Sequence, residues 1–255
     1  MILTDTHTHL YSKDSPFPVD ELIHRAENNH VFRFFLPNID RETCSDVLDL
    51  QNLYPGKCFA MLGLHPVHVK EDYIQQLNYI EGLIGVHPIS AIGEIGLDLY
   101  WDQTFIKEQK KAFELQCEWA SSRNLPISIH CRNAFPEILE ILKSLKHLNV
   151  RGIFHCFTGT EEEAKQIIDL GFYLGIGGVL TYKNSNLKES LKDIDLKHLV
   201  LETDSPYLPP VPFRGKPNES AYLIYIAEFL AQLKNVSLKE LADITTENSR
   251  IIFGH

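Results

Sequence analysis

The sequence lacks any long hydrophobic run, and no stretch approaches the about 20 apolar residues that a membrane-spanning helix needs. Its first residues, MILTD, lead directly into a polar stretch. They do not contain the basic segment followed by an apolar one that marks a signal peptide. We therefore expect a cytoplasmic protein without a membrane partner.

Cysteines are few and odd in number. The five of them are scattered and never have C-x-x-C spacing: Cys44, Cys58, Cys117, Cys131 and Cys156. This pattern argues against a disulfide framework and favours free thiols in a reducing compartment.

Basic residues are outnumbered, with 24 Lys and Arg against 34 Asp and Glu, which gives a net charge of −10. Such a charge excludes a broad basic surface for duplex DNA, although it permits a nucleic acid held at one local site. Internal repeats, low-complexity tracts and Gly/Ser-rich linkers are also absent. We therefore expect residues 1–255 to form a single domain.

A short apolar, β-rich segment recurs along the chain, and helix-like stretches lie between its copies. Two of these stretches are Lys107–Asn124 and Glu161–Leu170. Alternating strands and helices predict a parallel sheet, and eight strands in a chain of this length predict a single (β/α)8 TIM barrel, an α/β fold. The predicted strands are Ile2–Asp5, Val31–Leu36, Phe59–Gly63, Ile89–Gly93, Pro126–Ile129, Gly152–Phe154, Phe172–Ile176 and Leu199–Thr203.

Polar residues follow these predicted strands, where the active site of such a barrel lies. In Asp5-Thr6-His7-Thr8-His9 the histidines occupy alternate positions, so on a strand they would share one face, with Asp5 one layer below. The later strands end in further polar residues: His65, Glu94, His130, His155 and Asp204. A barrel would bring these distant residues to one mouth.

Imidazoles and carboxylates together suit divalent metals such as Zn or Mn, and Mg less well. Six ligands exceed the need of one tetrahedral ion but suit two ions about 3.5–4 Å apart that share a carboxylate. We assign His7, His9 and Asp204 to one ion, His130 and His155 to the other, and Glu94 as the bridge.

The two carboxylates offset only half of the charge of two divalent ions, so the mouth would be locally positive and would suit a phosphate substrate. A divalent ion also lowers the pKa of bound water towards roughly 7. Asp204 would then act as the general base for that water. The site therefore predicts metal-dependent hydrolysis.

These residues lie in motifs that resemble the TatD-type deoxyribonucleases, a branch of the metal-dependent hydrolases with an amidohydrolase-like barrel. The matching motifs span nearly the whole chain: DTHTHL (5–10), GLHP (63–66), GEIGLD (93–98), HCR (130–132), HCFTG (155–159) and LETDSPYL…RGKPNE (201–219). The resemblance implies a divalent-metal hydrolase that acts on DNA as a 3′–5′ exonuclease on single strands. The acidic exterior predicts that it binds DNA weakly and without sequence specificity. The resemblance also implies the same six metal ligands.

The resemblance further places His65 at the mouth as a contact to substrate phosphate. Arg132, Arg214 and Lys216 are the basic residues that we expect to hold the strand. The loop after strand eight departs from the family pattern at Phe213 and Pro217, where a histidine and a basic residue are common. This departure weakens the expected grip on nucleic acid and leaves the ligand set unchanged. We expect a monomer.

Several alternatives remain open at this stage. The same barrel could hydrolyse small phosphoesters, or amides and lactones, although many enzymes of the latter kind bridge their metals with a carboxylated lysine where this chain has Glu94. A binding protein without activity would be expected to have lost a ligand. Arg132 could clamp a phosphate or form a salt bridge at the rim. Tyr100 and Trp101 could stack on a base or pack within their loop. Glu202 is interpreted as a supporting acid.

Overall fold

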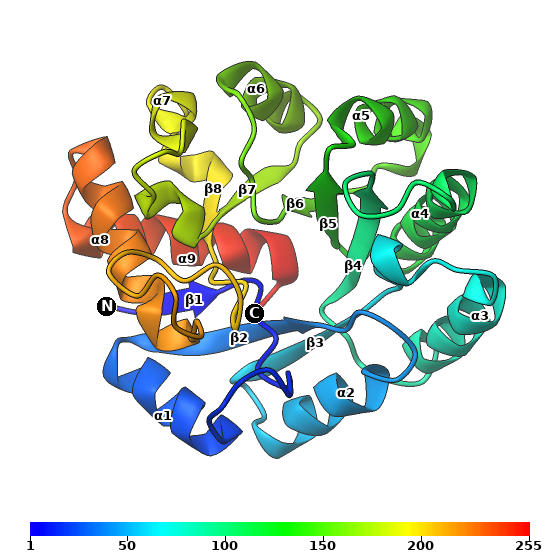
Figure 1. The fold of residues 1–255 in the computed structure, drawn as a ribbon, viewed down its shortest axis with the longest axis horizontal. Helices are drawn as coiled ribbons and strands as arrows, with labels where there is room; N and C mark the ends of the chain where they lie inside the picture. The colour runs from blue at the N-terminus through cyan, green and yellow to red at the C-terminus, as the bar shows by residue number, and fades with distance from the viewer.

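The structure is a computed structural model that describes residues 1–255. Eight parallel strands form one sheet in the order in which they occur in the chain, and Figure 1 shows them at the centre of a ring of helices. The strands are β1 (Leu3–Asp5), β2 (Val31–Pro37), β3 (Cys58–Leu62), β4 (Ala91–Asp98), β5 (Ile127–Arg132), β6 (Gly152–Phe154), β7 (Tyr173–Ile176) and β8 (Leu199–Leu201).

Hydrogen bonds just beyond the ends of β1 and β8 join the first and last strands. The Thr6 amide donates to the Leu201 carbonyl oxygen over 3.0 Å, and the Asp204 amide donates to the His7 carbonyl oxygen over 2.9 Å. The Thr6 hydroxyl adds a second bond to Leu201. The sheet therefore closes on itself, and the predicted (β/α)8 barrel is confirmed.

The helices form the outer ring (Figure 1). They are α1 (Val19–Asn28), α2 (Cys44–Leu53), α3 (Tyr73–Ile84), α4 (Ile106–Arg123), α5 (Phe135–Ser144), α6 (Glu161–Asp169), α7 (Leu187–Leu191), α8 (Leu223–Lys234) and α9 (Leu238–Phe253). Short 3-10 helices are η1 (Pro66–His68), η2 (Lys146–Leu148), η3 (Gly178–Thr181), η4 (Leu196–His198) and η5 (Ser220–Tyr222). None of the helices is both long and apolar enough to cross a membrane.

Local sequence explains where two of these helices begin and end. The Thr160 hydroxyl accepts the Glu163 amide and the Glu163 carboxylate accepts the Thr160 amide, a reciprocal pair that starts α6. Asn124 adopts a left-handed conformation, with φ of 53°, and ends α4. Both helices agree with the predicted ranges to within one residue.

The barrel interior changes from apolar to polar along its axis. A buried cluster at the end of the barrel away from the histidines contains one residue from each of five strands: Phe35, Met61, Ala91, Ile153 and Val200. The last turn of α9 closes this end, where Phe253 stacks on Phe35 with ring centroids 4.2 Å apart. Because strand side chains alternate between faces, the next inward positions come two residues later. Those positions are Pro37, Gly63, Gly93, His155 and Glu202, so a proline, two glycines and two ionisable residues replace the apolar layer.

Two strands are longer than predicted, and this corrects the expected positions of two site residues. β4 continues to Asp98 and β5 to Arg132, so Glu94 and His130 lie within strands rather than at their ends. The pairing register shifts between Ile92 and Ile95, because β4 has one more residue there than the paired segment of β5. Such a bulge redirects side chains locally, and a regular alternating pattern does not reveal it.

Candidate metal centre

The two histidines after β1 are each held by a contact of their Nδ1 atom with a hydroxyl group. His7 Nδ1 lies 3.2 Å from the Ser128 hydroxyl. His9 Nδ1 lies 2.9 Å from the Tyr11 hydroxyl, which in turn donates to the Pro37 carbonyl oxygen over 2.6 Å. Tyr11 therefore accepts the Nδ1 proton of His9 and leaves Nε2 as the free donor atom. Tyr11 is not among the site residues that the sequence pattern predicted.

Glu94 lies at the centre of the histidines, and its two oxygens face different partners. Oε1 is 2.7 Å from His155 Nε2 and 2.9 Å from His130 Nδ1. Oε2 is 3.2 Å from His7 Nε2 and 3.8 Å from His9 Nε2. This is the geometry that a bridging carboxylate requires, with one oxygen for each set of imidazoles.

Asp204 joins the set from the end of β8. Its Oδ1 lies 3.4 Å from His9 Nε2 and 3.8 Å from His7 Nε2. The residue has a left-handed backbone with φ of 56°, and its amide donates to the carbonyl oxygen of His7 just after β1. Asp5 lies beneath it and accepts both the amide and the hydroxyl of Thr203, over 2.9 and 2.6 Å. Asp5 thus positions the segment that carries Asp204.

Two further residues contact the second set of imidazoles. His65 Nε2 is 3.3 Å from both Glu94 Oε1 and His130 Nδ1, so it lies against the cluster itself and is mostly buried. The Asp98 carboxylate lies 2.9 Å from His130 Nε2. Asp98 was not predicted as a site residue, although it ends the motif GEIGLD (93–98).

The donor atoms gather closely enough to hold a metal ion. Three overlapping groups each have all ligand atoms within 4.8 Å of one another: His7, His155 and Asp204; His7, His9 and Glu94; and His65, Glu94 and His130. His7 Nε2 is buried without a hydrogen-bond partner, which a native protein seldom tolerates. A divalent cation would satisfy it, and the nitrogen and oxygen donors suit Zn or Mn. The residues present therefore fit a divalent metal, while the assignment of each ligand stays a prediction.

The electrostatics of the cluster favour a cation. Burial by itself would raise the pKa of Glu94, but His155, His65 and His7 hold it well below its usual range. Burial would likewise raise the pKa of Asp204, yet the bond from His9 and the nearby imidazoles lower it. Burial also lowers the pKa of His65 to about 4. The two carboxylates are therefore ionised, and His65 is neutral at physiological pH.

Glu202 supports the cluster from below. It is fully buried, its Oε1 accepts the Cys156 amide over 2.5 Å, and the same oxygen lies 3.6 Å from His155 Nδ1. A side chain at Gly175 would overlap this carboxyl group, so the glycine makes room for it. Burial raises the pKa of the Cys156 thiol well above its usual value, so this thiol stays protonated.

The predicted basic residues lie on the rim. The Arg132 guanidinium is 4.0 Å from the centre of the Tyr100 ring, and that of Arg214 is 3.9 Å from the centre of the Tyr182 ring. Arg214 and Lys216 are exposed. Phe213, one of the two departures from the family pattern, stacks on Tyr222 at 3.8 Å and therefore packs within the loop.

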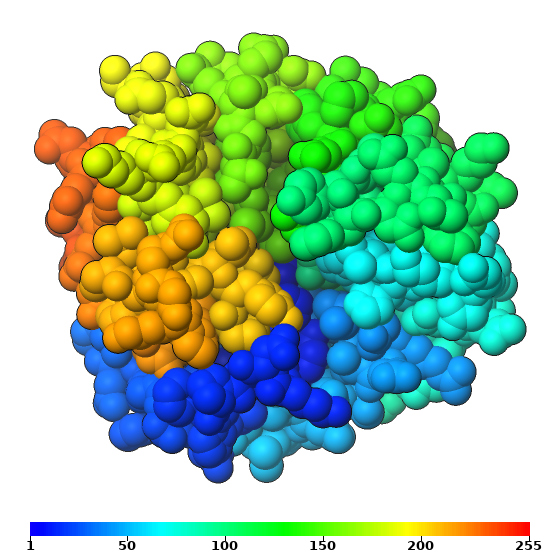
Figure 2. Space-filling model, viewed as in Figure 1, coloured from blue at the N-terminus to red at the C-terminus, as the bar shows by residue number.

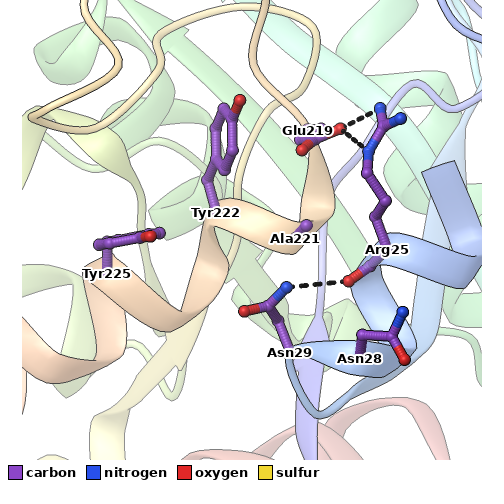
Figure 3. A pocket seen from close by; sticks show the side chains of 7 residues that line it. All are labelled: Arg25, Asn28, Asn29, Glu219, Ala221, Tyr222 and Tyr225. Atoms are coloured by element: carbon purple, nitrogen blue, oxygen red, sulfur yellow. Dashed lines mark hydrogen bonds and ion pairs between the residues drawn. The ribbon is translucent and has the colours of Figure 1, made fainter.

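The mouth is open to solvent. Figure 2 shows a hollow at the middle of this face, bordered by the loop of residues 205–220, the segment after β1 and the segment after β4. The loop is fastened at its C-terminal end, where Arg25 of α1 pairs with Glu219 (Figure 3). A separate cavity of about 190 Å³ lies beside this ion pair, and none of its lining residues belongs to the histidine cluster.

Comparisons with known proteins agree with the fold and with a metal-dependent hydrolase. The family model described as TatD related DNase matches residues 4–254. The uncharacterised metal-dependent hydrolase YabD of Bacillus subtilis is 40% identical over 253 residues, which cover 99% of each chain. The uncharacterised metal-dependent hydrolase YcfH of Escherichia coli is 33% identical over 99% of this chain and 96% of its own. The crystal structure of YjjV, a TatD homologue from Escherichia coli, superposes with a TM-score of 0.93 at 29% identity, covering 99% of this chain and 98% of that one.

Proposed function

The chain belongs to the TatD related DNase family and is a metal-dependent hydrolase, and from this premise we propose that it cleaves phosphodiester bonds of DNA. More specifically, we propose that it removes nucleotides from the 3′ ends of single strands, without sequence specificity and as a monomer.

The observation that carries the proposal is the position of Glu94 between two sets of imidazoles. In this proposal His7, His9 and Asp204 hold one divalent ion, and His130 and His155 hold a second, with Glu94 shared. The ions are Zn, Mn or Mg. When bound, they would supply positive charge beside a phosphate and lower the pKa of a water molecule.

The side chains of the mouth have separate roles in this reaction. Asp204 is ionised, partly exposed, and held by the hydrogen bond of its amide to the His7 carbonyl oxygen, so its carboxylate is placed to accept a proton from the attacking water. His65 and Arg132 would bind oxygens of the scissile phosphate, because one lies against Glu94 and the other on the rim.

The charge distribution favours a strand end over a long duplex. The protein has a net charge of −10, so its attraction for a polyanion is confined to the mouth. The exposed cations there are Arg132, Arg214 and Lys216. A few basic side chains beside a metal centre suit a short single-stranded segment that reaches into the hollow.

The proposal is tested with a single-stranded oligonucleotide labelled at either end and protein stripped of metal. Mg, Mn or Zn is then added back, and Asp204→Asn runs in parallel. We expect a metal-dependent ladder that shortens from the 3′ end and that the variant loses. Exposed Glu247→Gln on α9 is the matched control and should cleave normally.

Protein shown to hold two ions but unable to cleave DNA with any metal would refute the proposal. The search would then move to small phosphoesters and to amides. Cleavage from the 5′ end, or within the strand, would support the proposed nuclease activity but refute the proposed 3′–5′ direction.

A further inference from the structure

We propose that Tyr100, Trp101 and Arg132, here called the aromatic rim, form a stacking site for an unpaired nucleobase next to the scissile phosphate. This inference rests on the proposed function and deepens it, because it names the feature of the strand end that the enzyme recognises. The aromatic rim lies after β4 and at the end of β5, at the edge of the mouth.

The two aromatic side chains are unusually open for their size. Trp101 is 66% exposed and Tyr100 is 54% exposed, whereas the other tryptophan of the chain, Trp119, is 3% exposed. Their rings meet edge to face, with centroids 5.0 Å apart. Such a pair leaves apolar ring surface uncovered, and a flat base can cover it.

Arg132 holds this pair in place and keeps its charge free. Its guanidinium lies 4.0 Å from the centre of the Tyr100 ring and 5.1 Å from that of Trp101. The arginine ion pairs of the structure involve Arg25, Arg123 and Arg250, and not Arg132. The Arg132 cation is therefore available to the phosphate that accompanies a stacked base.

Asp98 connects the aromatic rim to the metal centre. Its Oδ1 accepts the amides of Tyr100 and Trp101, over 3.0 and 3.1 Å. Its Oδ2 lies 2.9 Å from His130 Nε2, and His130 Nδ1 lies 2.9 Å from Glu94. One buried carboxylate thus fixes both the loop that carries the rings and a histidine of the cluster. A base on the rings would be next to a phosphate at the centre.

This arrangement selects unpaired ends for a physical reason. A base inside a duplex has its faces covered by neighbouring base pairs, so it must leave the stack before it can lie on the rings. For a base at a single-stranded end, the free energy of unpairing and unstacking is small. The aromatic rim therefore explains a preference for single strands on a protein with few basic residues.

The test compares a single-stranded oligonucleotide with the same strand made abasic at its last two 3′ nucleotides. We expect kcat/KM to be about tenfold higher for the strand with bases, because base–aromatic stacking is commonly of that size. Trp101→Ala should reduce this ratio to about 1–2, and Trp101→Phe should retain most of it. Tyr79→Ala is the matched control, since Tyr79 is 40% exposed on α3 and also lies against an arginine, Arg41 at 4.6 Å.

A second measurement does not depend on cleavage. In Trp119→Phe protein, Trp101 is the only tryptophan, and its fluorescence is followed in metal-stripped protein as either strand is added. We expect quenching by the strand with bases and none by the abasic strand.

The outcomes separate this inference from the proposed function. If the protein cleaves DNA and Trp101→Ala leaves the ratio of kcat/KM for the two strands unchanged, the stacking site is refuted and the nuclease is not. Quenching by bases in a protein that cleaves no DNA would support the stacking site and refute the nuclease. Equal quenching by both strands would overturn the stacking site whatever the activity.

Discussion

Replacing Glu202 with glutamine should weaken metal binding without weakening the fold. The Glu202 carboxyl group is fully buried beside Gly175, accepts the Cys156 amide and faces His155 Nδ1 at 3.6 Å. Glutamine has nearly the same shape and keeps an oxygen for the Cys156 amide. It removes only the negative charge that orients the His155 ring and strengthens His155 as a donor.

The expected loss of metal affinity is about 10–100-fold, the usual effect of removing a carboxylate behind a ligand histidine. That range corresponds to a loss of roughly 1.4–2.7 kcal/mol in the free energy of metal binding. The effect on thermal stability should be small, because the charge of Glu202 attracts His155 and repels Asp5. Burial, with a contribution from the charge of Glu202, raises the pKa of Asp5 to about 7. Removing the Glu202 charge relieves that repulsion but also removes the attraction that raises the pKa of His155, so the Tm of metal-free protein should change little.

Affinity is measured by titrating metal-stripped protein with Zn or Mn in competition with a chelating dye. Thermal unfolding of the metal-free protein is measured alongside, and Glu247→Gln on the exposed face of α9 is the control. An affinity that stays within about twofold of the native value would refute the reasoning, because the effect of such a carboxylate is normally larger. A large fall in the Tm without metal would also contradict it, since it would show that the attraction between Glu202 and His155 outweighs the repulsion between Glu202 and Asp5.

Three further predictions follow from the same structure. Lys216→Ala should raise KM for DNA with little change in kcat and should reduce the salt dependence of binding by about one charge, measured as the slope of log Kd against log salt. Burial alone would lower the pKa of His155, but Glu94 and Glu202 raise it well above its usual value, so protons compete with metal there. Metal affinity should therefore increase from about pH 6 to about pH 8, which the same dye titration measures, and a flat profile would contradict it. Phe113→Ala on α4 should lower the free energy of unfolding by about 3–5 kcal/mol in urea titrations, because the ring is fully buried, and a loss below about 1 kcal/mol would show that the core collapses around the gap.

Much of the fold was predictable because its signals are local. Six of the eight strands agree with the predicted ranges to within two residues, since short apolar runs between helical stretches are visible in the sequence. The ends of β4 and β5 were wrong. Glycines and an acidic residue in Gly93-Glu94-Ile95-Gly96 are typical of a strand end, yet backbone pairing with β5 carries the strand on to Asp98.

The sequence named the ionisable residues that gather in the candidate site, but it did not name the residues that hold them in place. The motifs named six possible ligands, and the structure brings the other five together around Glu94. His65 was expected as a phosphate contact, and it lies against Glu94 and His130. Asp98 and Tyr11 were missed because each acts through another residue. A hydrogen bond to the far nitrogen of a histidine leaves no fixed spacing in the chain.

The sequence by itself determined the order of strands and helices, the polar residues that follow the strands, and the acidic balance of the whole protein. These properties depend on neighbouring residues and on composition, so they are present before the chain folds. Only the tertiary structure decided which oxygen of Glu94 faces which imidazole, and that Asp98 joins His130 to the loop of Tyr100 and Trp101. Those relations come from closing the barrel, because closure sets side chains from distant strands within a few ångströms of one another.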